Sequence, residues 1–431
     1  MQKVGSGSSQ LSDSGVSKTG AGEEIQTKGQ RRFTRLATIV LPVLFGILLF
    51  CPASWAKASW DMRQLSVAPQ VFPAGSFHEP GVRAMFFQGL PWHGKPTQVF
   101  AWYGVPKHTG TAKLPAMVLV HGGAGTAFAD WVRLWNDRGY AAIAIDTCGS
   151  VPIREGKRSW QRHELGGPPC WGLDQITEPV EDKWNYHAVA DVILANSLLR
   201  SFPEVDAKRI GLTGISWGGY LTAIIASVDT RFRFAVPVYG CGFLGEDSYW
   251  LSDFAKLGPV NAKQWLELWD PSVYLPGVRM PLLWVDGTND EFYPLESLRK
   301  SYLLPHGSRT LSTHVRMEHG YEAGEPPEEI HAFADYYLRS GEPLAKIRSL
   351  KREGDSAWIT YKAKVQIEKA GLNYTLDSGT WNKRAWSAVP AQLDAARHTV
   401  RVTIPKGATA FYFDLIDKRN LIVSSDLQGP G

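Results

Sequence analysis

Apolar runs alternate with helix-like segments through the middle of this chain, and this alternation restricts the possible folds more than any other feature. The runs at residues 114–125, 140–149 and 280–287 are apolar and end in glycine, as strands buried on both faces of a parallel sheet do. Segments with helical spacing, such as residues 185–202, lie between them. Strand alternating with helix over roughly 260 residues predicts an α/β fold whose doubly wound, mostly parallel sheet has helices on both faces.

The pattern changes on either side of this region, which we expect to span residues 80–345. Residues 352–428 alternate apolar and polar side chains between turn signals, which predicts a small antiparallel C-terminal module resembling a β-sandwich. Residues 1–35 are rich in Gly and Ser, and we expect them to be disordered. Within the α/β region, residues 149–182 and 241–278 are predicted to be irregular insertions.

An apolar segment at residues 36–56 follows a basic stretch and ends in small residues. This combination is typical of a secretory signal peptide, and an uncleaved membrane anchor is the alternative. Both predict that the rest of the chain is secreted or periplasmic, with membrane contact only through this segment.

Charge and motif content exclude several classes of function. The net charge is only +4, and no basic block interrupts the folded part, so nucleic-acid binding gains no support. No Cys/His cluster has the spacing of zinc ligands and no phosphate-binding loop occurs, so we expect neither metal nor cofactor. Cys148 and Cys170 flank a Gly/Pro-rich insertion, and a disulfide between them is the favoured pairing in an oxidising compartment. Buried free thiols, with Cys241, are the alternative.

A serine lies where a strand-like run meets a helix-like one. Ser216 is flanked by Gly214 and Gly218 in the run "RIGLTGISWGGY". A strand that turns sharply into a helix can hold a serine hydroxyl above the sheet as a nucleophile, although Gly-x-Ser-x-Gly also occurs by chance in turns. Attack by such a serine requires a base and an acid that orients the base.

Candidates for the acid and the base follow in that order along the chain. Asp290 lies in the loop after the run at 280–287, four residues after Asp286, whereas Asp286 itself is expected to cap or turn the chain there. His319 follows the predicted strand 312–318 and precedes a glycine, so its ring can reach the serine. The other downstream histidines lie in less suitable contexts: a strand start, a helix or the C-terminal module, for His314, His331 and His398.

An oxyanion site requires two backbone N–H groups that point at one atom. The predicted donors are Trp217, directly after the serine, and Gly123, in the glycine corner "HGGAG" after an earlier strand. Three tryptophans in the insertions, Trp160, Trp171 and Trp250, present flat faces for sugar rings, or else they pack beneath the insertions.

Three elements, "GISWGGY", "GTNDEFYP" and the His-Gly pair at His319, resemble the α/β-hydrolase superfamily over about residues 80–345. They are similar to catalytic domains of the prolyl oligopeptidase type, and to secreted acetyl xylan esterases and dienelactone hydrolase-like proteins. The resemblance implies Ser216, Asp290 and His319 as the catalytic triad. Two departures matter. Prolyl oligopeptidases usually carry a β-propeller before the hydrolase domain, whereas only about 25 residues separate the predicted signal from that region here. Trp217 stands where one acetyl esterase subgroup has Gln.

These observations predict a secreted serine hydrolase that cleaves carboxylic esters through an acyl-enzyme, with a small acyl ester or a decorated polysaccharide, such as acetylated xylan, as substrate. A serine peptidase of the prolyl oligopeptidase type is the alternative. A non-catalytic adhesion protein of the same fold is the third hypothesis, against which the complete set of triad residues argues.

Overall fold

The computed structural model describes residues 57–107, 110–123, 125–153 and 159–429. Residues Ala53–Gly431 form one compact unit. The predicted disordered segment and the predicted signal or anchor, residues 1–35 and 36–56, lie outside the described residues. Among the residues described, no helix combines the length and the apolarity needed to cross a membrane.

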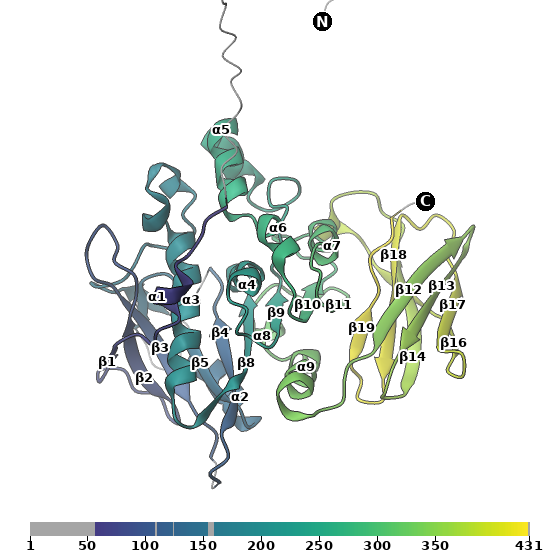
Figure 1. Cartoon of the computed structure of the whole chain (residues 1–431). Coiled ribbons are helices and arrows are strands. Elements are labelled where there is room, and N and C mark those ends of the chain that lie inside the picture. Colours follow the sequence, from purple (N-terminus) through teal and green to yellow (C-terminus); the bar gives the residue numbers. More distant parts are fainter. Residues whose placement is uncertain (1–56, 108–109, 124, 154–158, 430–431) are drawn as a thin grey trace, which may run out of the picture. The chain divides into compact units, whose positions relative to one another are not determined.

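A nine-stranded sheet organises the first part of this unit, in the order β1-β2-β3-β5-β4-β8-β9-β10-β11 (Figure 1). The six strands from β5 to β11 pair in parallel and the first three antiparallel. The predicted α/β class is confirmed. The strands are Val71–Pro73, Arg83–Gln88, Gln98–Gly104, Leu114–Val120 (β4), Ala141–Ile145 (β5), Val205–Ile215 (β8), Ala235–Val238 (β9), Leu282–Gly287 (β10) and Arg309–His314 (β11).

Helices cover both faces of this sheet (Figure 1). Because both faces are covered, β4 and β5 are apolar along nearly their whole length and buried. The main helices are Ala129–Asp137 (α2), Trp184–Ser201 (α3), Trp217–Val228 (α4), Leu295–Leu303 (α7) and Glu328–Arg339 (α9). α3 packs beside α4, while α2 meets α9 through the rings of Trp135 and His331, 4.9 Å apart.

The two predicted insertions differ in outcome. Residues 149–182 hold a short ribbon of Ser150–Pro152 (β6) and Trp160–Arg162 (β7), followed by two 3-10 turns at Asp174–Thr177 and Val180–Asp182. The prediction of an irregular segment at 241–278 was wrong, because most of it is helix: Leu251–Trp269 (α5) and Pro271–Tyr274 (α6). A kink at Gly258, with φ of 77° and a following proline, interrupts α5 and obscures its helical period in the sequence.

The C-terminal module consists of two four-stranded antiparallel sheets. One sheet contains Lys346–Glu353 (β12), Ser356–Lys362 (β13), Thr399–Thr403 (β17) and Gln392–Asp394 (β16); the other contains Ser387–Pro390 (β15), Ile367–Thr375 (β14), Ala410–Asp417 (β18) and Ile422–Ser424 (β19). The module therefore begins a few residues before the predicted boundary at 352, just as the large sheet begins before residue 80.

Strand β19 of the module lies along β11, the edge strand of the large sheet. The backbone N–H of Thr313 donates to Ser424 Oγ at 2.9 Å, and that of Ile422 donates to Glu329 Oε1 at 2.7 Å. Backbone groups at this edge thus find partners, as buried backbone groups require. The module therefore covers the edge that lies nearest the loop carrying His319.

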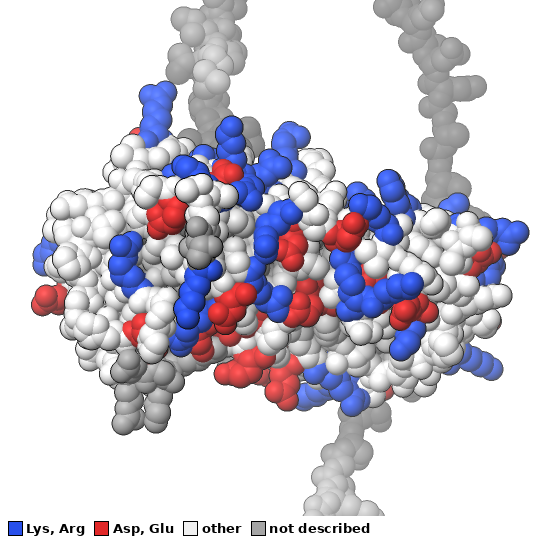
Figure 2. All heavy atoms as spheres, turned by 90° about the horizontal axis from the view of Figure 1, so that it is seen from below, with Lys and Arg blue, Asp and Glu red and all other residues white. Residues whose placement is uncertain are grey.

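Charged side chains of both signs are interspersed on the face that Figure 2 shows. The chain carries 46 basic and 42 acidic residues. On that face, the described residues form no extended stripe of a single sign.

Candidate active site

The junction between β8 and α4 holds Ser216 in a strained conformation. Its φ of 59° and ψ of −120° lie in a region that non-glycine residues rarely adopt, as at the sharp strand-to-helix turn of a nucleophile elbow. The flanking glycines make the turn possible. A Cβ at Gly214 would lie 2.2 Å from the carbonyl oxygen of Gly218, and one at Gly218 would lie 2.0 Å from that of Val120.

The structure brings the three predicted catalytic side chains into hydrogen-bond order. His319 Nε2 lies 2.9 Å from Ser216 Oγ, and His319 Nδ1 lies 2.5 Å from Asp290 Oδ2. The other oxygen of Asp290 accepts from the backbone N–H groups of Phe292 and Tyr293, each at 2.8 Å. The buried carboxylate is thereby fixed, and it fixes the imidazole in turn.

Aromatic rings hold the imidazole from the sides. The ring of Tyr239 lies 4.7 Å from that of His319, and the ring of Phe292 lies 4.5 Å away. With Nδ1–H directed at the carboxylate, Nε2 is left to accept the serine proton. The arrangement can therefore generate a serine nucleophile and return a proton to a leaving group.

The competing residues occupy other places. Asp286 is buried within β10 and accepts from the N–H of Gly287 at 2.7 Å, and burial, with the nearby Asp290 charge, raises its pKa well above the usual range. It lies inside the strand, and the turn follows at residues 288–289. His314 lies beside Ser312, and His398 packs on Tyr361 in the module.

Strand β11 ends at His314, earlier than the predicted strand end at 318. The chain turns at Arg316, whose φ is 56°. This early turn is what frees the following residues to carry His319 over the serine.

Trp217 and the glycine corner after β4 lie beside Ser216. Trp217 is the first residue of α4, where a backbone N–H has no acceptor within the helix. A Cβ at Gly123 would lie 2.6 Å from Trp171 Nε1 and 2.7 Å from Trp217 Cδ1, so the glycine corner after β4 lies against Trp217. The geometry suits a site for a developing oxyanion.

Sequence reasoning missed Tyr321, which lies at the same corner. Its hydroxyl accepts from the N–H of Gly122 at 2.8 Å, and its ring lies 4.7 Å from that of Phe128. The single signal in the sequence was its place two residues after His319, which no catalytic motif requires.

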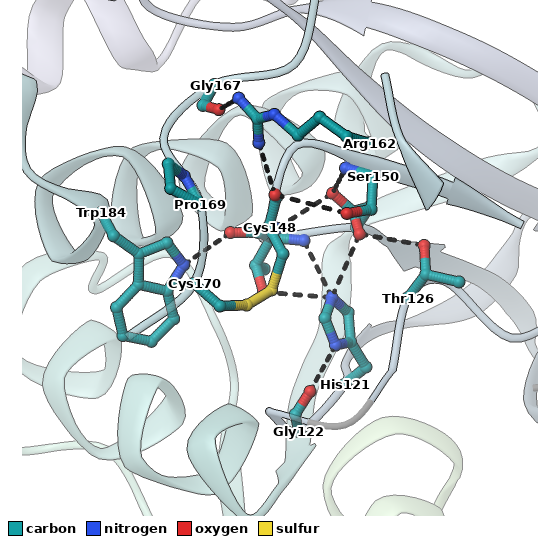
Figure 3. Close-up of a disulfide and its surroundings, with 12 residues drawn as sticks. His121, Gly122, Thr126, Cys148, Ser150, Arg162, Gly167, Pro169, Cys170 and Trp184 are labelled. Atoms are coloured by element: carbon teal, nitrogen blue, oxygen red, sulfur yellow. Dashed lines mark hydrogen bonds and ion pairs between the residues drawn. A yellow bond between two sulfur atoms is a disulfide. The ribbon is translucent and has the colours of Figure 1, made fainter. Parts of the chain in front are cut away.

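The disulfide between Cys148 and Cys170, the favoured pairing, forms beside this corner (Figure 3). It ties the segment after β5 to the loop that carries Trp171. Arg162 reinforces the link by donating to the carbonyl of Cys148 at 2.7 Å and to that of Gly166 at 2.9 Å. Cys241 is a buried free thiol.

The three predicted sugar-binding tryptophans are placed differently. Trp171, with 48% of its surface exposed and a positive φ, lies against Gly123 at the corner. Trp250 is buried and packs on Trp217 at 4.7 Å, which fits the packing interpretation. Trp160 is exposed on β7, and none of the ring contacts seen among the described residues joins it to the triad.

His121, Asp146 and Cys148 bring three potential metal-ligating atoms together, but each has a partner already. The sulfur of Cys148 is bonded to Cys170. His121 Nε2 accepts from the N–H of Thr147 at 2.9 Å, and Nδ1 lies 2.6 Å from the carbonyl of Gly122. This cluster therefore braces the glycine corner, as Figure 3 shows.

Comparisons with known proteins agree with this fold. The model of the acetyl xylan esterase family (AXE1) matches residues 52–258, just under half of the chain. Two solved structures are similar. An acetyl xylan esterase from Paenibacillus sp. R4 is 22% identical with a TM-score of 0.50, and covers 64% of this chain and 92% of that one. Acetyl xylan esterase 1 from Thermoanaerobacterium sp. JW/SL YS485 is 18% identical with a TM-score of 0.51. The superposed part covers 66% of this chain and 96% of that esterase.

Curated relatives carry peptidase names. The uncharacterized peptidase YuxL of Bacillus subtilis (strain 168) is 24% identical over 209 residues, which is 45% of this chain and 28% of that protein. Dipeptidyl-peptidase 5 of Trichophyton schoenleinii is 25% identical over 195 residues, which is 42% of this chain and 24% of that protein. The chain thus matches about a quarter of the length of these relatives.

Together, the structure and the comparisons show the α/β-hydrolase fold, which this chain shares with the two solved acetyl xylan esterases. Its activity, its substrate and the roles of individual residues are proposals.

Proposed function

We propose that the protein hydrolyses carboxylic esters, with acetyl groups on a carbohydrate as the foremost substrate, through an acyl-enzyme on Ser216. The observation that carries the proposal is the Ser216–His319–Asp290 relay beside a crowded glycine corner. Ser216 Oγ attacks the acyl carbon while its proton passes to His319 Nε2. The resulting oxyanion accepts hydrogen bonds from the N–H groups of Trp217 and Gly123.

Collapse of the tetrahedral intermediate breaks the bond to the alcohol oxygen, which takes the proton from His319. A water molecule then attacks the acyl-enzyme with His319 again as base, releasing the carboxylic acid and restoring Ser216. Asp290 keeps its charge throughout and stabilises the imidazolium.

The crowded corner supports a small acyl group. Indole atoms of Trp171 and Trp217 approach so closely that even a methyl group on Gly123 would collide with them. The acyl group of the intermediate must lie next to this corner, because its oxyanion is bound there. A short chain such as acetyl fits this space better than a long one, and the AXE1 match points the same way.

The disulfide supports a location outside the cytoplasm. Cys148–Cys170 closes a loop of the site, and such bonds persist chiefly in oxidising compartments. The apolar segment at residues 36–56 is the proposed signal or anchor. We therefore propose that the enzyme works in the periplasm or outside the cell.

Amide hydrolysis is the second candidate, because the curated relatives named above carry peptidase names. The two candidates differ in what the leaving group requires, since an amine must be protonated as it departs and an alkoxide is a better leaving group. The test compares kcat/KM on an aryl acetate, an acetylated xylo-oligosaccharide and a dipeptidyl aryl amide. We expect measurable ester hydrolysis and little or no amide hydrolysis; comparable or faster amide cleavage contradicts the esterase proposal.

An acyl-length series tests the crowded corner directly. Aryl esters of acetate, butyrate and octanoate share one leaving group, so differences in kcat/KM report on the acyl side alone. We expect kcat/KM to fall as the chain lengthens, and a preference for octanoate would contradict the proposal of a small acyl group.

A further inference from the structure

An open cleft of about 560 Å³ lies beside His319, and its walls come from two distant parts of the chain. One wall belongs to the two loops that carry Asp290 and His319, with Phe292 and Arg316 among its residues. The other belongs to the C-terminal module, in the loop at residues 382–385. The module therefore reaches the site, although its strands carry none of the triad.

The module's loop is fastened to the residue next to the catalytic acid. Asn289 Nδ2 donates to the backbone carbonyl of Arg384 at 2.8 Å and to that of Asn382 at 3.1 Å, and Asn289 directly precedes Asp290. The Arg384 guanidinium lies 3.5 Å from the centre of the Trp381 ring and donates to the carbonyl of Gly379 at 2.8 Å. These contacts give the loop a fixed shape against the triad.

The reaction itself assigns the occupant of this cleft. His319 must deliver its proton to the departing alcohol oxygen, so the alcohol lies on the imidazole side of Ser216. The acyl oxygen lies on the other side, against Gly123 and Trp217. Because the cleft is lined by His319, it is on the side where the alcohol leaves.

The lining fits an alcohol that is rich in hydroxyl groups. Exposed charges of both signs face the cleft, with Arg316 and Lys383 against Glu291 and Glu318, so donors and acceptors are both present and neither sign dominates. Phe292 adds a half-buried ring that continues to the 56% exposed Tyr249, 4.7 Å away. Hydrogen-bonding groups around an aromatic face suit a neutral sugar chain, whose rings have an apolar face and a polar rim.

We propose that the C-terminal module is part of the substrate site, and that its loop at residues 382–385 forms the wall that holds the sugar chain from which the ester is removed. This inference rests on the proposed function, because it takes the alcohol side of the same reaction. It assigns Asn382 and Lys383, both exposed, as specificity-determining residues.

The test uses the full chain with the double substitution Asn382→Ala and Lys383→Ala. In the Ser216→Ala background, binding of unacetylated xylotetraose is measured by calorimetry, with a tetrapeptide of similar length as the competing probe. We expect the double substitution to weaken xylotetraose binding about tenfold, the scale of two lost hydrogen bonds. In the Ser216 enzyme, KM for an acetylated xylo-oligosaccharide should rise by a similar factor, and its kcat/KM should fall at least fivefold more than that for aryl acetate.

Lys351→Ala with Lys406→Ala, two exposed positions of the module outside the cleft lining, is the matched control and should alter none of these values. Unchanged xylotetraose affinity and KM in the double variant would overturn the inference. Equal losses on both substrates would overturn it too, since the loop would then act through Asp290. Preferred binding of the tetrapeptide would have the same consequence.

The two proposals fail in different ways. If the enzyme binds xylotetraose through Asn382 and Lys383 but cleaves no ester, the proposed sugar-binding wall stands and the proposed function is wrong. If the enzyme cleaves aryl acetate but does not bind xylotetraose, the proposed function stands and the proposed sugar-binding wall is wrong.

Discussion

The large sheet and the C-terminal module are both built on β-strands, but they differ in strand direction and therefore in where their loops lie. In the large sheet, the six strands from β5 to β11 run parallel, so the loops that follow β4, β8, β10 and β11 meet at one edge, where ligands of open α/β sheets bind. In the module, strands run antiparallel and alternate direction, so successive loops leave from opposite ends. The first arrangement concentrates reactive groups, whereas the second offers single loops as walls.

This contrast separates rate from discrimination. Changes at the sheet edge should alter the chemical step for every substrate, and changes in the module should alter either the choice of substrate or the stability of the fold. Each prediction below tests that division, and the largest expected effect comes first.

Ser216→Ala should have the largest effect. Loss of the nucleophile should lower kcat by about 10⁵ or more, because triad members act as a unit, and labelling by a fluorophosphonate probe should disappear. The measurement is mass spectrometry of the labelled protein together with ester turnover. The exposed Ser387 of the module provides the control, since Ser387→Ala should label as fully as the unsubstituted enzyme. Persistent labelling in Ser216→Ala would mean that another residue is the nucleophile.

Substitution of His319 and of His331 tests the same division within the hydrolase region, because His319 lies at the sheet edge and His331 lies in helix α9. His319→Ala should lower kcat by about 10⁴ or more with little change in unfolding free energy. His331 is buried against Trp135, and burial, with the Arg138 charge, lowers its pKa to about 4. His331→Ala should therefore cost about 1–3 kcal/mol of stability and change kcat only slightly.

Kinetics and denaturant unfolding of both histidine variants decide the matter. The opposite pattern, a stable but inactive His331→Ala beside a destabilised but active His319→Ala, would show that the wrong histidine has been assigned as the base.

Gly123→Ala should have the next largest effect. The added methyl would lie 2.6 Å from Trp171 Nε1 and 2.7 Å from Trp217 Cδ1, so the corner must shift, and a displaced oxyanion donor lowers kcat by about 10²–10³. Gly371→Ala in the module, where the nearest atom would be 3.4 Å away, is the matched control. Steady-state kcat values for an aryl acetate test the pair, and equal values would remove Gly123 from the oxyanion site.

Much of the fold and site could be predicted because sequence and geometry are tied locally. β4 and β10 are almost continuously apolar since both faces are covered, and Ser216, Asp290 and His319 each follow a strand, in the order that the fold requires. The prediction for α5 failed at Gly258 and Pro259, which mark a kink in the structure but resemble a loop in the sequence.

Contacts between distant segments were beyond reach of such reasoning. Asn289 and Arg384 are 95 residues apart, and neither belongs to a motif that would pair them. The position of Tyr321 at Gly122 likewise depends on how the loop after β11 folds back over β4. The sequence favours pairing of Cys148 with Cys170 because they flank a Gly/Pro-rich insertion, but only the structure shows that this disulfide lies beside the glycine corner.

The smallest expected effect concerns the pH dependence of stability, and it tests the module alone. Asp414 on β18 accepts from Asn373 at 2.5 Å and from Ser424 at 2.6 Å. Burial outweighs these two hydrogen bonds and raises the pKa of Asp414 from 3.8 to about 7. Between those values the folded protein binds more protons than the unfolded chain at this residue. The contribution of Asp414 to stability is therefore fully present below about pH 4 and is lost as the pH rises through 7.

Asp414→Asn removes this titration, so the unfolding free energy of the variant should fall less between pH 4 and 8 than that of the unsubstituted protein. The difference is a few kcal/mol at most, since one pK unit corresponds to about 1.4 kcal/mol. Denaturant unfolding across this pH range measures it, with Asp394→Asn as the control, because Arg397 and the neighbouring backbone lower the pKa of Asp394 and the sign of its effect is reversed. Aryl acetate turnover by folded Asp414→Asn should match that of the unsubstituted enzyme at each pH. A shifted pH–rate profile would show that the module's interior is coupled to the chemical step, and the division between the two regions would not hold.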